Sequence, residues 1–246
     1  MGTFYNPKII TDGLLLCLDV ANTKSYSGSG TTWTDLSGRN NNGTIVNNPI
    51  YSSGATANFS LDGVDEYIYT SGFSNVSIGN WPVSMEIWFN SGTVINNDFV
   101  YLGGVRSGSD NYVPLGIGLE ARNAWAGNYS SNYGVVAISN YPRYAKSSPG
   151  SIIDNTWYQI VQTATSDNTK LYINGVLVDT SSSSQTYYTG ITSSWGIGCA
   201  GYTGGSVEYS AYTSNQKISV FKIYNIELTA IQILQNYQAL RGRFGI

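Results

Sequence analysis

Short runs of β-branched, aromatic and aliphatic residues recur along the whole chain, separated by clusters of Gly, Asn, Ser and Asp. Such spacing is typical of a sandwich or barrel, because βαβ units would need helical patterns of about 10–15 residues between the strands. Twelve strands are predicted, a number that suits two packed sheets. They span residues 14–20, 57–61, 66–70, 83–90, 99–105, 115–119, 134–139, 157–164, 170–173, 176–180, 195–199 and 217–224.

One hairpin is predicted from its turn residues. The segment 170–180 reads KLYINGVLVDT and places Asn174 and Gly175 between two apolar runs. A two-residue type I′ turn needs positive φ at both central positions, and Asn-Gly adopts this conformation at low cost. The runs on either side are therefore expected to pair across the turn.

A helix is predicted near the C-terminus, over residues 229–240. Thr229 and Gln232 have the spacing of a capping box, in which each side chain binds the backbone N–H of the other residue. Apolar side chains recur at helical spacing along this segment. They belong to Leu228, Ile231, Leu234, Tyr237 and Leu240.

Composition and charge limit both the architecture and the function. No Pro/Gly linker, charge block or long repeat divides the sequence, so residues 1–246 are predicted to form one domain. The net charge of −3 provides no basic footprint for nucleic acid or an anionic membrane. The chain has no His, which removes Ser-His and Cys-His nucleophilic chemistry. Cys17 and Cys199 lie in apolar contexts and are expected to be buried free thiols.

Several longer blocks occur in a fixed order: GLLLCLDVANTKSYSGSGTTWTDLSGRNNNGTIVNNPIY, SLDGVDEYIYTS, SMEIWFN, WYQIV, KLYINGVLVDT and IYNIELTAIQILQNYQALRGRFGI. Together they closely resemble the laminin-G-like, concanavalin A-like jelly-roll family. The segments SYSGSGTTWTDLSG and QNYQALRGRFG are most similar to the versions found in tailed-phage structural proteins. The resemblance implies an all-β fold, a two-sheet antiparallel jelly-roll sandwich with one short C-terminal helix.

The resemblance also implies roles for single residues. Asp35, Ser37 and Gly38 lie in WTDLSG, which resembles the family's WxDxSG turn. In such a turn the Asp and Ser side chains accept from nearby backbone amides, and the Gly takes a positive φ. Trp88 and Trp157 match family positions that fill the space between the two sheets, so they are expected in that core.

Glycoside hydrolases on this fold carry carboxylates at alternate positions of one strand, so that acid and nucleophile flank the scissile bond. The comparable strand here offers only Glu86, whose neighbours at alternate positions are Ser84 and Trp88. A second carboxylate would have to come from a loop, and Asp98 and Asp110 are the candidates. The sequence therefore predicts a chain that is not an enzyme.

A calcium site has one candidate cluster, formed by Asp62, Asp65 and Glu66, with Asp12 and Asp19 as further contributors. Calcium takes about six to eight oxygen ligands, which is more than this cluster provides. The simpler interpretation is that Asp62 begins a turn and Asp65 binds loop backbone, and we favour it. No cofactor is assigned with certainty.

Aromatic residues interleaved with Asn mark the candidate recognition surface. A sugar site needs a ring under the C–H face of the sugar and polar groups around its hydroxyls. The segment 122–144 offers Trp125, Tyr129, Tyr133, Tyr141 and Tyr144 together with Asn128 and Asn132. A second set holds Tyr187, Tyr188, Tyr202, Tyr209 and Tyr212. Contact with a neighbouring subunit explains these residues as well as sugar binding does, and both interpretations stay open here.

The sequence thus predicts a non-enzymatic virion surface protein of a bacteriophage, a capsid decoration or tail-associated adhesin. Its expected partners are other virion proteins, host-surface polysaccharide and further copies of itself, with neither nucleic acid nor a membrane among them. The N-terminus lacks a secretion-signal pattern, so synthesis in the host cytoplasm and incorporation into the particle are expected. The alternatives are a bacterial cell-surface or secreted lectin module and, ranked lower, a glycoside hydrolase.

Overall fold

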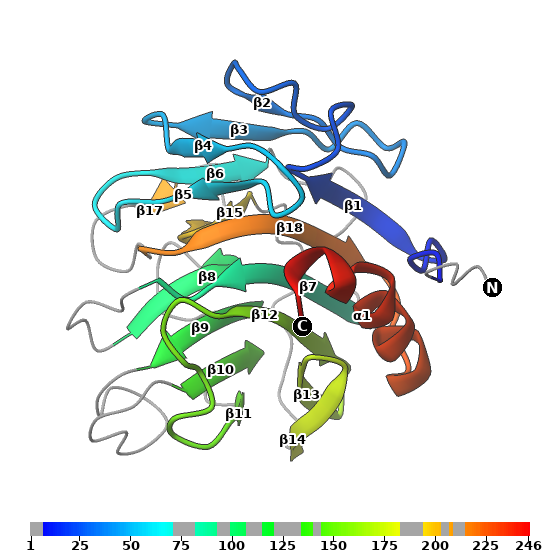
Figure 1. Cartoon of the computed structure of the whole chain (residues 1–246). Coiled ribbons are helices and arrows are strands. Elements are labelled where there is room, and N and C mark those ends of the chain that lie inside the picture. The colour runs from blue at the N-terminus through cyan, green and yellow to red at the C-terminus, as the bar shows by residue number, and fades with distance from the viewer. Residues whose placement is uncertain are drawn as a thin grey trace.

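The computed structural model of the chain describes residues 7–70, 82–92, 99–106, 115–120, 134–139, 144–182, 194–202, 207–208 and 215–246. Within these ranges the chain forms 18 strands and one helix. The strands are arranged in two sheets that stack face to face, with the helix packed on the outside (Figure 1). The predicted two-sheet sandwich with a short C-terminal helix is confirmed.

The first sheet has eight strands. Along the sheet they are β14 (Val176–Ser182), β13 (Asn168–Ile173), β12 (Trp157–Ala164), β7 (Val83–Asn90), β18 (Lys217–Tyr224), β5 (Asn58–Ser60) and β4 (Ile50–Ser52), and β1 (Leu14–Asp19) also pairs with β18. Every pairing in this sheet is antiparallel. Strands β7, β12 and β18 form its centre.

The second sheet has ten strands. Along the sheet they are β11 (Tyr144–Lys146), β10 (Gly134–Ser139), β9 (Leu115–Glu120), β8 (Phe99–Arg106), β15 (Trp195–Ile197), β6 (Tyr67–Thr70), β3 (Gly43–Val46) and β2 (Thr32–Trp33). Strand β16 (Ala200–Tyr202) pairs in parallel with β8, and β17 (Val207–Glu208) pairs with β16. All the other pairings are antiparallel.

The main hydrophobic core fills the space between the two sheets. It follows from the period of two along each strand, because alternate side chains point to opposite faces. On β8, Val100 and Leu102 point into this core, whereas Phe99 and Tyr101 belong to a separate cluster on the outer face. Burial of each large apolar side chain contributes about 1.5–3 kcal/mol, so the core is the main source of stability.

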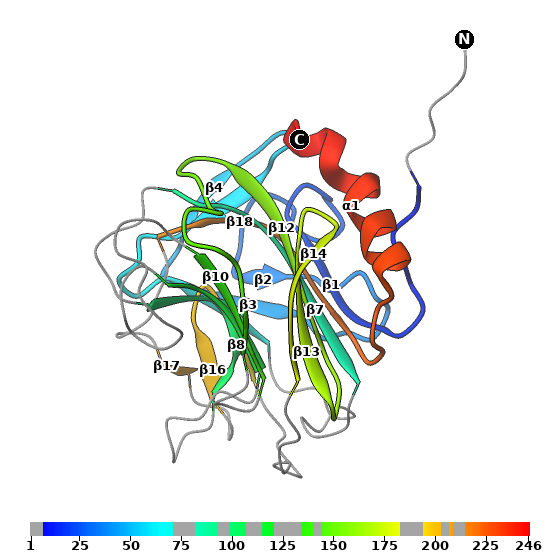
Figure 2. The same ribbon diagram turned by 90° about the horizontal axis from the view of Figure 1, so that it is seen from below.

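The helix α1 (Ala230–Phe244) covers the outer face of the eight-stranded sheet (Figure 2). The Phe244 ring stacks on Trp88 at 4.5 Å between centroids and lies 4.6 Å from the ring of Trp157. The expectation that both tryptophans fill the space between the sheets is therefore wrong. On β7 it is Met85, Ile87 and Phe89 that point into that core, and alternation turns Trp88 towards the helix.

All twelve predicted strands are present, and the Asn-Gly hairpin is confirmed, with φ of 50° at Asn174 and 80° at Gly175. The capping box of Thr229 and Gln232 is also confirmed, but the helix continues to Phe244 and ends on Gly245 in the left-handed conformation. No helix within the described ranges is long and apolar enough to span a membrane. The number of domains stays a prediction.

Candidate functional site

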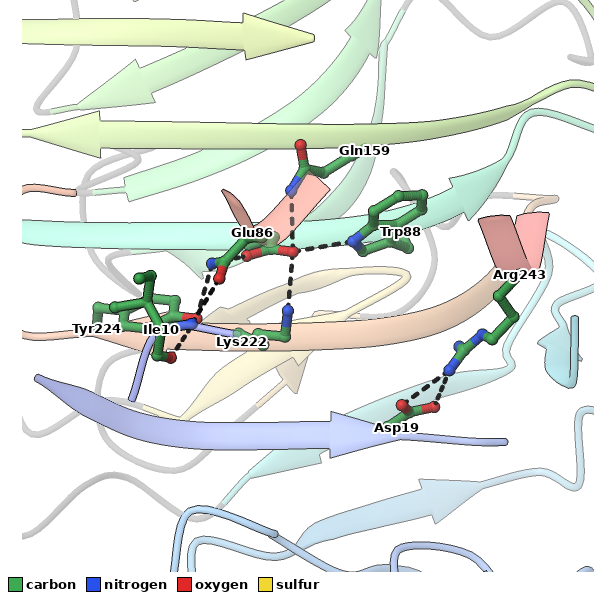
Figure 3. Close-up of polar contacts among 9 residues, drawn as sticks. Ile10, Asp19, Glu86, Trp88, Gln159, Lys222, Tyr224 and Arg243 are labelled. Atoms are coloured by element: carbon green, nitrogen blue, oxygen red, sulfur yellow. Dashed lines mark hydrogen bonds and ion pairs between the residues drawn. The ribbon is translucent and has the colours of Figure 1, made fainter. Parts of the chain in front are cut away.

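Glu86 is completely buried between the eight-stranded sheet and α1 (Figure 3). Its Oε1 accepts hydrogen bonds from Trp88 Nε1 at 2.9 Å, Gln159 Nε2 at 3.1 Å and Lys222 Nζ at 2.9 Å. Its Oε2 accepts from Asn236 Nδ2 of α1 at 2.8 Å. Three strands and the helix therefore meet at one carboxylate.

The same network holds the N-terminal segment against the helix. Asn236 also donates to the Tyr224 hydroxyl at 3.0 Å and accepts from the backbone N–H of Ile10 at 2.7 Å. The Tyr224 hydroxyl in turn donates to the Ile10 carbonyl at 3.2 Å. The polar chain thus links residues far apart in sequence, which is a structural role.

Burial alone would raise the pKa of Glu86, but Lys222 and the donors Gln159 and Trp88 outweigh it, so the pKa lies below its ordinary value. A general acid for glycoside hydrolysis needs the opposite shift and contact with substrate. Glu86 has a lowered pKa and a fully buried side chain, and it shares its face of β7 with Ser84 and Trp88, as the sequence predicts. Glu86 therefore acts as an anchor for the helix.

The turn at WTDLSG is confirmed as a structural element. Asp35 Oδ1 accepts from the backbone N–H of Cys17 at 2.9 Å and of Ser37 at 2.8 Å. Its Oδ2 accepts from the Ser37 hydroxyl and from the backbone N–H of Asn41. Gly38 has a φ of 83°, as this turn requires. These contacts hold the loop together and tie it to β1. Because both oxygens of the Asp35 carboxylate already accept hydrogen bonds, the group serves the loop and not a ligand.

In the acidic cluster Asp62 begins a turn, as expected, while the other carboxylate that binds loop backbone among the described contacts is that of Glu66. Asp62 Oδ1 accepts from the backbone N–H of Val64 at 2.8 Å and of Asp65 at 3.4 Å, while Glu66 Oε2 accepts from the backbone N–H of Asp62. Asp19 lies with Arg243 instead. No three acidic, His or Cys side chains converge on a metal position within the described ranges. The three side chains of Asp62, Asp65 and Glu66 alone do not supply the roughly six to eight oxygens that calcium takes.

Most of the predicted recognition set lies outside the described residues: Trp125, Tyr129, Tyr133, Tyr141, Asn128 and Asn132, together with Tyr187, Tyr188, Tyr209 and Tyr212. Tyr202 is described only as a strand residue of β16. Tyr144 is described in full, as the first residue of β11 at the edge of the ten-stranded sheet. It is half-buried and presents part of its side chain to solvent.

The surroundings of Tyr144 form an aromatic cluster on the outer face of the ten-stranded sheet. Tyr144 packs against Phe99, Tyr101, Val136 and Ile138, which come from β8 and β10. The rings of Phe99 and Tyr101 meet edge to face with centroids 4.8 Å apart. We call these five residues the outer-face cluster. The cluster supports the Tyr144 side chain, and Tyr144 as a whole residue remains partly exposed.

Glycine makes room for this cluster on the strand between β8 and β10. A Cβ atom at Gly118 of β9 would collide with the Phe99 ring, so the ring lies directly across the β9 backbone. Sequence analysis missed Phe99 and Tyr101 as site residues. The alternation in 99–102 carried the signal, since two aromatic residues share one face there and two aliphatic residues share the other.

The other two residues of β11, Ala145 and Lys146, hold this edge strand in place. The backbone N–H of Lys146 donates to Asp179 Oδ2 of β14 at 2.9 Å, which joins the edges of the two sheets. Ala145 is buried in the main core. Tyr144 therefore sits on a strand whose other two residues are held in place, and its own side chain packs against the outer-face cluster.

Comparison with known families agrees with this architecture. The family model for the concanavalin A-like lectin/glucanases superfamily matches residues 62–234, more than two thirds of the chain. The chain belongs to this superfamily. Among curated protein sequences, none matches this superfamily member.

Solved structures of the same fold have low sequence identity to this superfamily member. The sialidase of Trypanosoma rangeli in complex with sialic acid aligns with a TM-score of 0.67 at 14% identity, over 94% of this chain and 33% of the sialidase. Botulinum neurotoxin type C, whose cell entry depends on interaction with two ganglioside molecules, gives 0.65 at 19% identity, over 94% and 52%. The chain thus spans about a third of the sialidase, and these likenesses show the fold.

A third structure matches in size as well. Domain 4 of an extracellular GH43 arabinanase from Geobacillus stearothermophilus, in complex with arabinotriose, aligns with a TM-score of 0.61 at 17% identity. The alignment covers 91% of this chain and 98% of that domain. This chain and the arabinanase domain therefore align over nearly the full length of both.

Proposed function

We propose that this superfamily member is a non-enzymatic glycan-binding module on the surface of a bacteriophage particle. The observation that carries the glycan part is Tyr144, a partly exposed aromatic residue on an edge strand that packs against the outer-face cluster. Such a ring offers a flat apolar face to the C–H side of a sugar, at little cost in conformational entropy.

Two similar structures support the choice of ligand class. The arabinanase domain is in complex with arabinotriose, and botulinum neurotoxin type C interacts with two ganglioside molecules. Both kinds of ligand present sugar units. The predicted set in 122–144 adds Trp and Tyr rings interleaved with Asn beside Tyr144 in the sequence, and Asn supplies donors and acceptors for hydroxyl groups.

We propose that the chain is not an enzyme because of the environment of Glu86. Its carboxylate is buried and bound by four donors, with a pKa below the ordinary value. A chain that uses its central carboxylate in this way has no acid for a glycosidic oxygen at that position. Incubation with the polysaccharide that the chain binds should release no reducing ends, and measurable release would contradict this part of the proposal.

The phage setting rests on the resemblance of SYSGSGTTWTDLSG and QNYQALRGRFG to tailed-phage structural proteins and on the low content of charged residues, 11% of the chain. We place the chain in a capsid decoration or a tail-associated adhesin, with other virion proteins and further copies of itself as neighbours. Mass spectrometry of purified particles should detect the chain. Its absence from particles, with recovery from the bacterial surface, would favour the bacterial lectin module.

The glycan part is tested with the recombinant chain on an array of bacterial surface polysaccharides and arabinose oligomers. We expect binding to a restricted set of glycans, unchanged when a chelator is added, because the Asp62 and Glu66 carboxylates are engaged with loop backbone. Binding to none of them would contradict the proposal. Binding that the chelator abolishes would restore calcium as a cofactor.

A further inference from the structure

A polar hollow lies at the opposite part of the sandwich from Tyr144. It has a volume of about 630 Å³ and is formed where three distant segments meet: the end of β1, the β4–β5 connection and the last turn of α1. Figure 1 shows β1 and β4 far from the β11 edge. The hollow is shallow and open to solvent, so a ligand held there would stay partly exposed. The lining residues are Asp19, Ala21, Asn22, Thr23, Gly54, Ala55 and Arg243.

Two of the lining residues, Asp19 and Arg243, form an ion pair, which Figure 3 shows. Arg243 Nη1 donates to Asp19 Oδ1 at 2.9 Å and to Oδ2 at 2.8 Å, and Nη2 donates to Ser219 Oγ at 2.7 Å. Ser219 is itself fixed, since its hydroxyl donates to the Ala57 carbonyl at 2.6 Å. The guanidinium group also lies over the Phe244 ring, 4.6 Å from its centroid. The pair is therefore held rigidly before any ligand binds.

The ion pair keeps unused hydrogen-bonding capacity. Each side chain remains 17% exposed. Within the described ranges, Asp19 Oδ2 accepts only from Arg243, although a carboxylate oxygen has two lone pairs, and Arg243 Nη2 donates only to Ser219. The lining thus includes a paired carboxylate and guanidinium group, each with hydrogen-bonding capacity beyond its contacts among the described residues.

This arrangement selects the chemistry of the ligand. The opposite charges of Asp19 and Arg243 cancel, so an anion would be repelled by the carboxylate and a cation by the guanidinium group. A hydroxyl group both donates and accepts, so two adjacent hydroxyls of one sugar ring match the pair. Ala21 and Ala55 offer small apolar walls, while Asn22 and Thr23 add exposed polar side chains.

We propose that this hollow is a second glycan subsite, which holds one unit of a neutral sugar through vicinal hydroxyls bound to Asp19 and Arg243. It is separate from the surface around Tyr144 and does not depend on it. A chain with two such subsites would hold one polysaccharide that reaches both of them more firmly than either subsite alone.

The test is a titration of the ¹⁵N-labelled full chain with the methyl glycosides of glucose, galactose, mannose and arabinose, each followed by amide chemical shifts. Sugar concentrations should reach about 50 mM, because a single sugar unit is expected to bind with a millimolar Kd. We expect saturable shifts at the amides of Ala21, Thr23 and Gly54 for at least one sugar. The amides of Tyr144 and Lys146 report separately on the other surface, so either site can fail without the other.

Matched variants complete the test. Ala55→Trp and, as a second variant, Thr23→Trp place a large ring at the hollow while both residues of the ion pair are kept, and we expect each to weaken binding at least tenfold. Ser29→Trp adds the same ring to an exposed position outside the hollow and should leave the titration unchanged. No saturable shift at these amides with any of the four sugars would overturn the proposal. Equal binding by the two filled variants and Ser29→Trp would overturn it as well.

Discussion

The buried ion pair of Glu86 and Lys222 makes a sharp prediction about stability. Both side chains are almost fully buried, with 0% and 1% exposed, and Nζ lies 2.9 Å from Oε1. At an effective dielectric constant of about 20, the attraction at this distance is about 6 kcal/mol, and desolvation of the two ions offsets much of it. The intact pair therefore adds little net stability, whereas loss of one partner leaves the other charge buried and unpaired.

Glu86→Gln should lower the free energy of unfolding by about 3–5 kcal/mol, because it leaves the Lys222 ammonium without a counter-charge. Such a loss is a large fraction of the roughly 5–15 kcal/mol by which a domain is stable. The double variant Glu86→Gln/Lys222→Met removes both charges and should recover at least about 2 kcal/mol of that loss. The assay is urea unfolding followed by Trp fluorescence. A loss under about 1 kcal/mol for the single variant, or additive losses in the double variant, would refute the reasoning.

Three further predictions follow from the same structure. Because the pKa of Glu86 is lowered from 4.5, its contribution to stability is present above that pH and is lost as the pH falls through the folded-state pKa. Urea unfolding at pH 7 and in acid should show that the difference in stability between wild type and Glu86→Gln becomes smaller in acid. A constant difference would contradict this. Thr229→Ala should cost about 1 kcal/mol by removing the helix cap, with Thr229→Ser close to wild type, and equal stability of all three would argue against the capping box. Burial raises the pKa of Cys17 to about 11, so a thiol reagent at pH 8 should label Cys17 only after unfolding, and rapid labelling of the native chain would show that the site opens.

Much of the fold could be predicted because local patterns agree with tertiary structure. Most of the strands that sequence analysis found are long, with apolar residues on both faces, as in VSMEIWFN of β7. The strands it missed are short, such as β2 and β4 with two and three residues. Their pairing depends on partners far away in sequence, and a short segment has no periodicity of its own.

The helix and the tryptophans show a second limit of the sequence. The predicted helix ended at residue 240, but Phe244 extends it by stacking on Trp88, a contact that joins residues far apart in the chain. The same contact explains why Trp88 lies outside the sandwich. A buried aromatic residue can be recognised from sequence, but which layer buries it depends on the side of the sheet to which the strand turns it.

For the candidate site, the sequence identified the aromatic residue but not the residues that pack against it. Tyr144 was identified from composition, whereas Phe99, Tyr101 and the glycine that lets Phe99 lie flat required the register of β8, β9 and β10. The hollow beside Arg243 had no sequence signal at all. It forms from a strand end, a connection and a helix end that meet only in the folded chain.

The central claim is that Tyr144 binds a glycan, and calorimetric titration of the chain with the strongest glycan from the array tests it most directly. Tyr144→Ala should weaken binding about tenfold, or by about 1.4 kcal/mol, while Tyr144→Phe keeps the ring and most of the affinity. Tyr69→Ala is the matched control, since Tyr69 is a half-buried tyrosine of the same sheet, on β6, five strand positions or about 24 Å from β11. We expect it to bind like the wild type. Unchanged affinity in Tyr144→Ala, or an equal loss in Tyr69→Ala, would contradict the account.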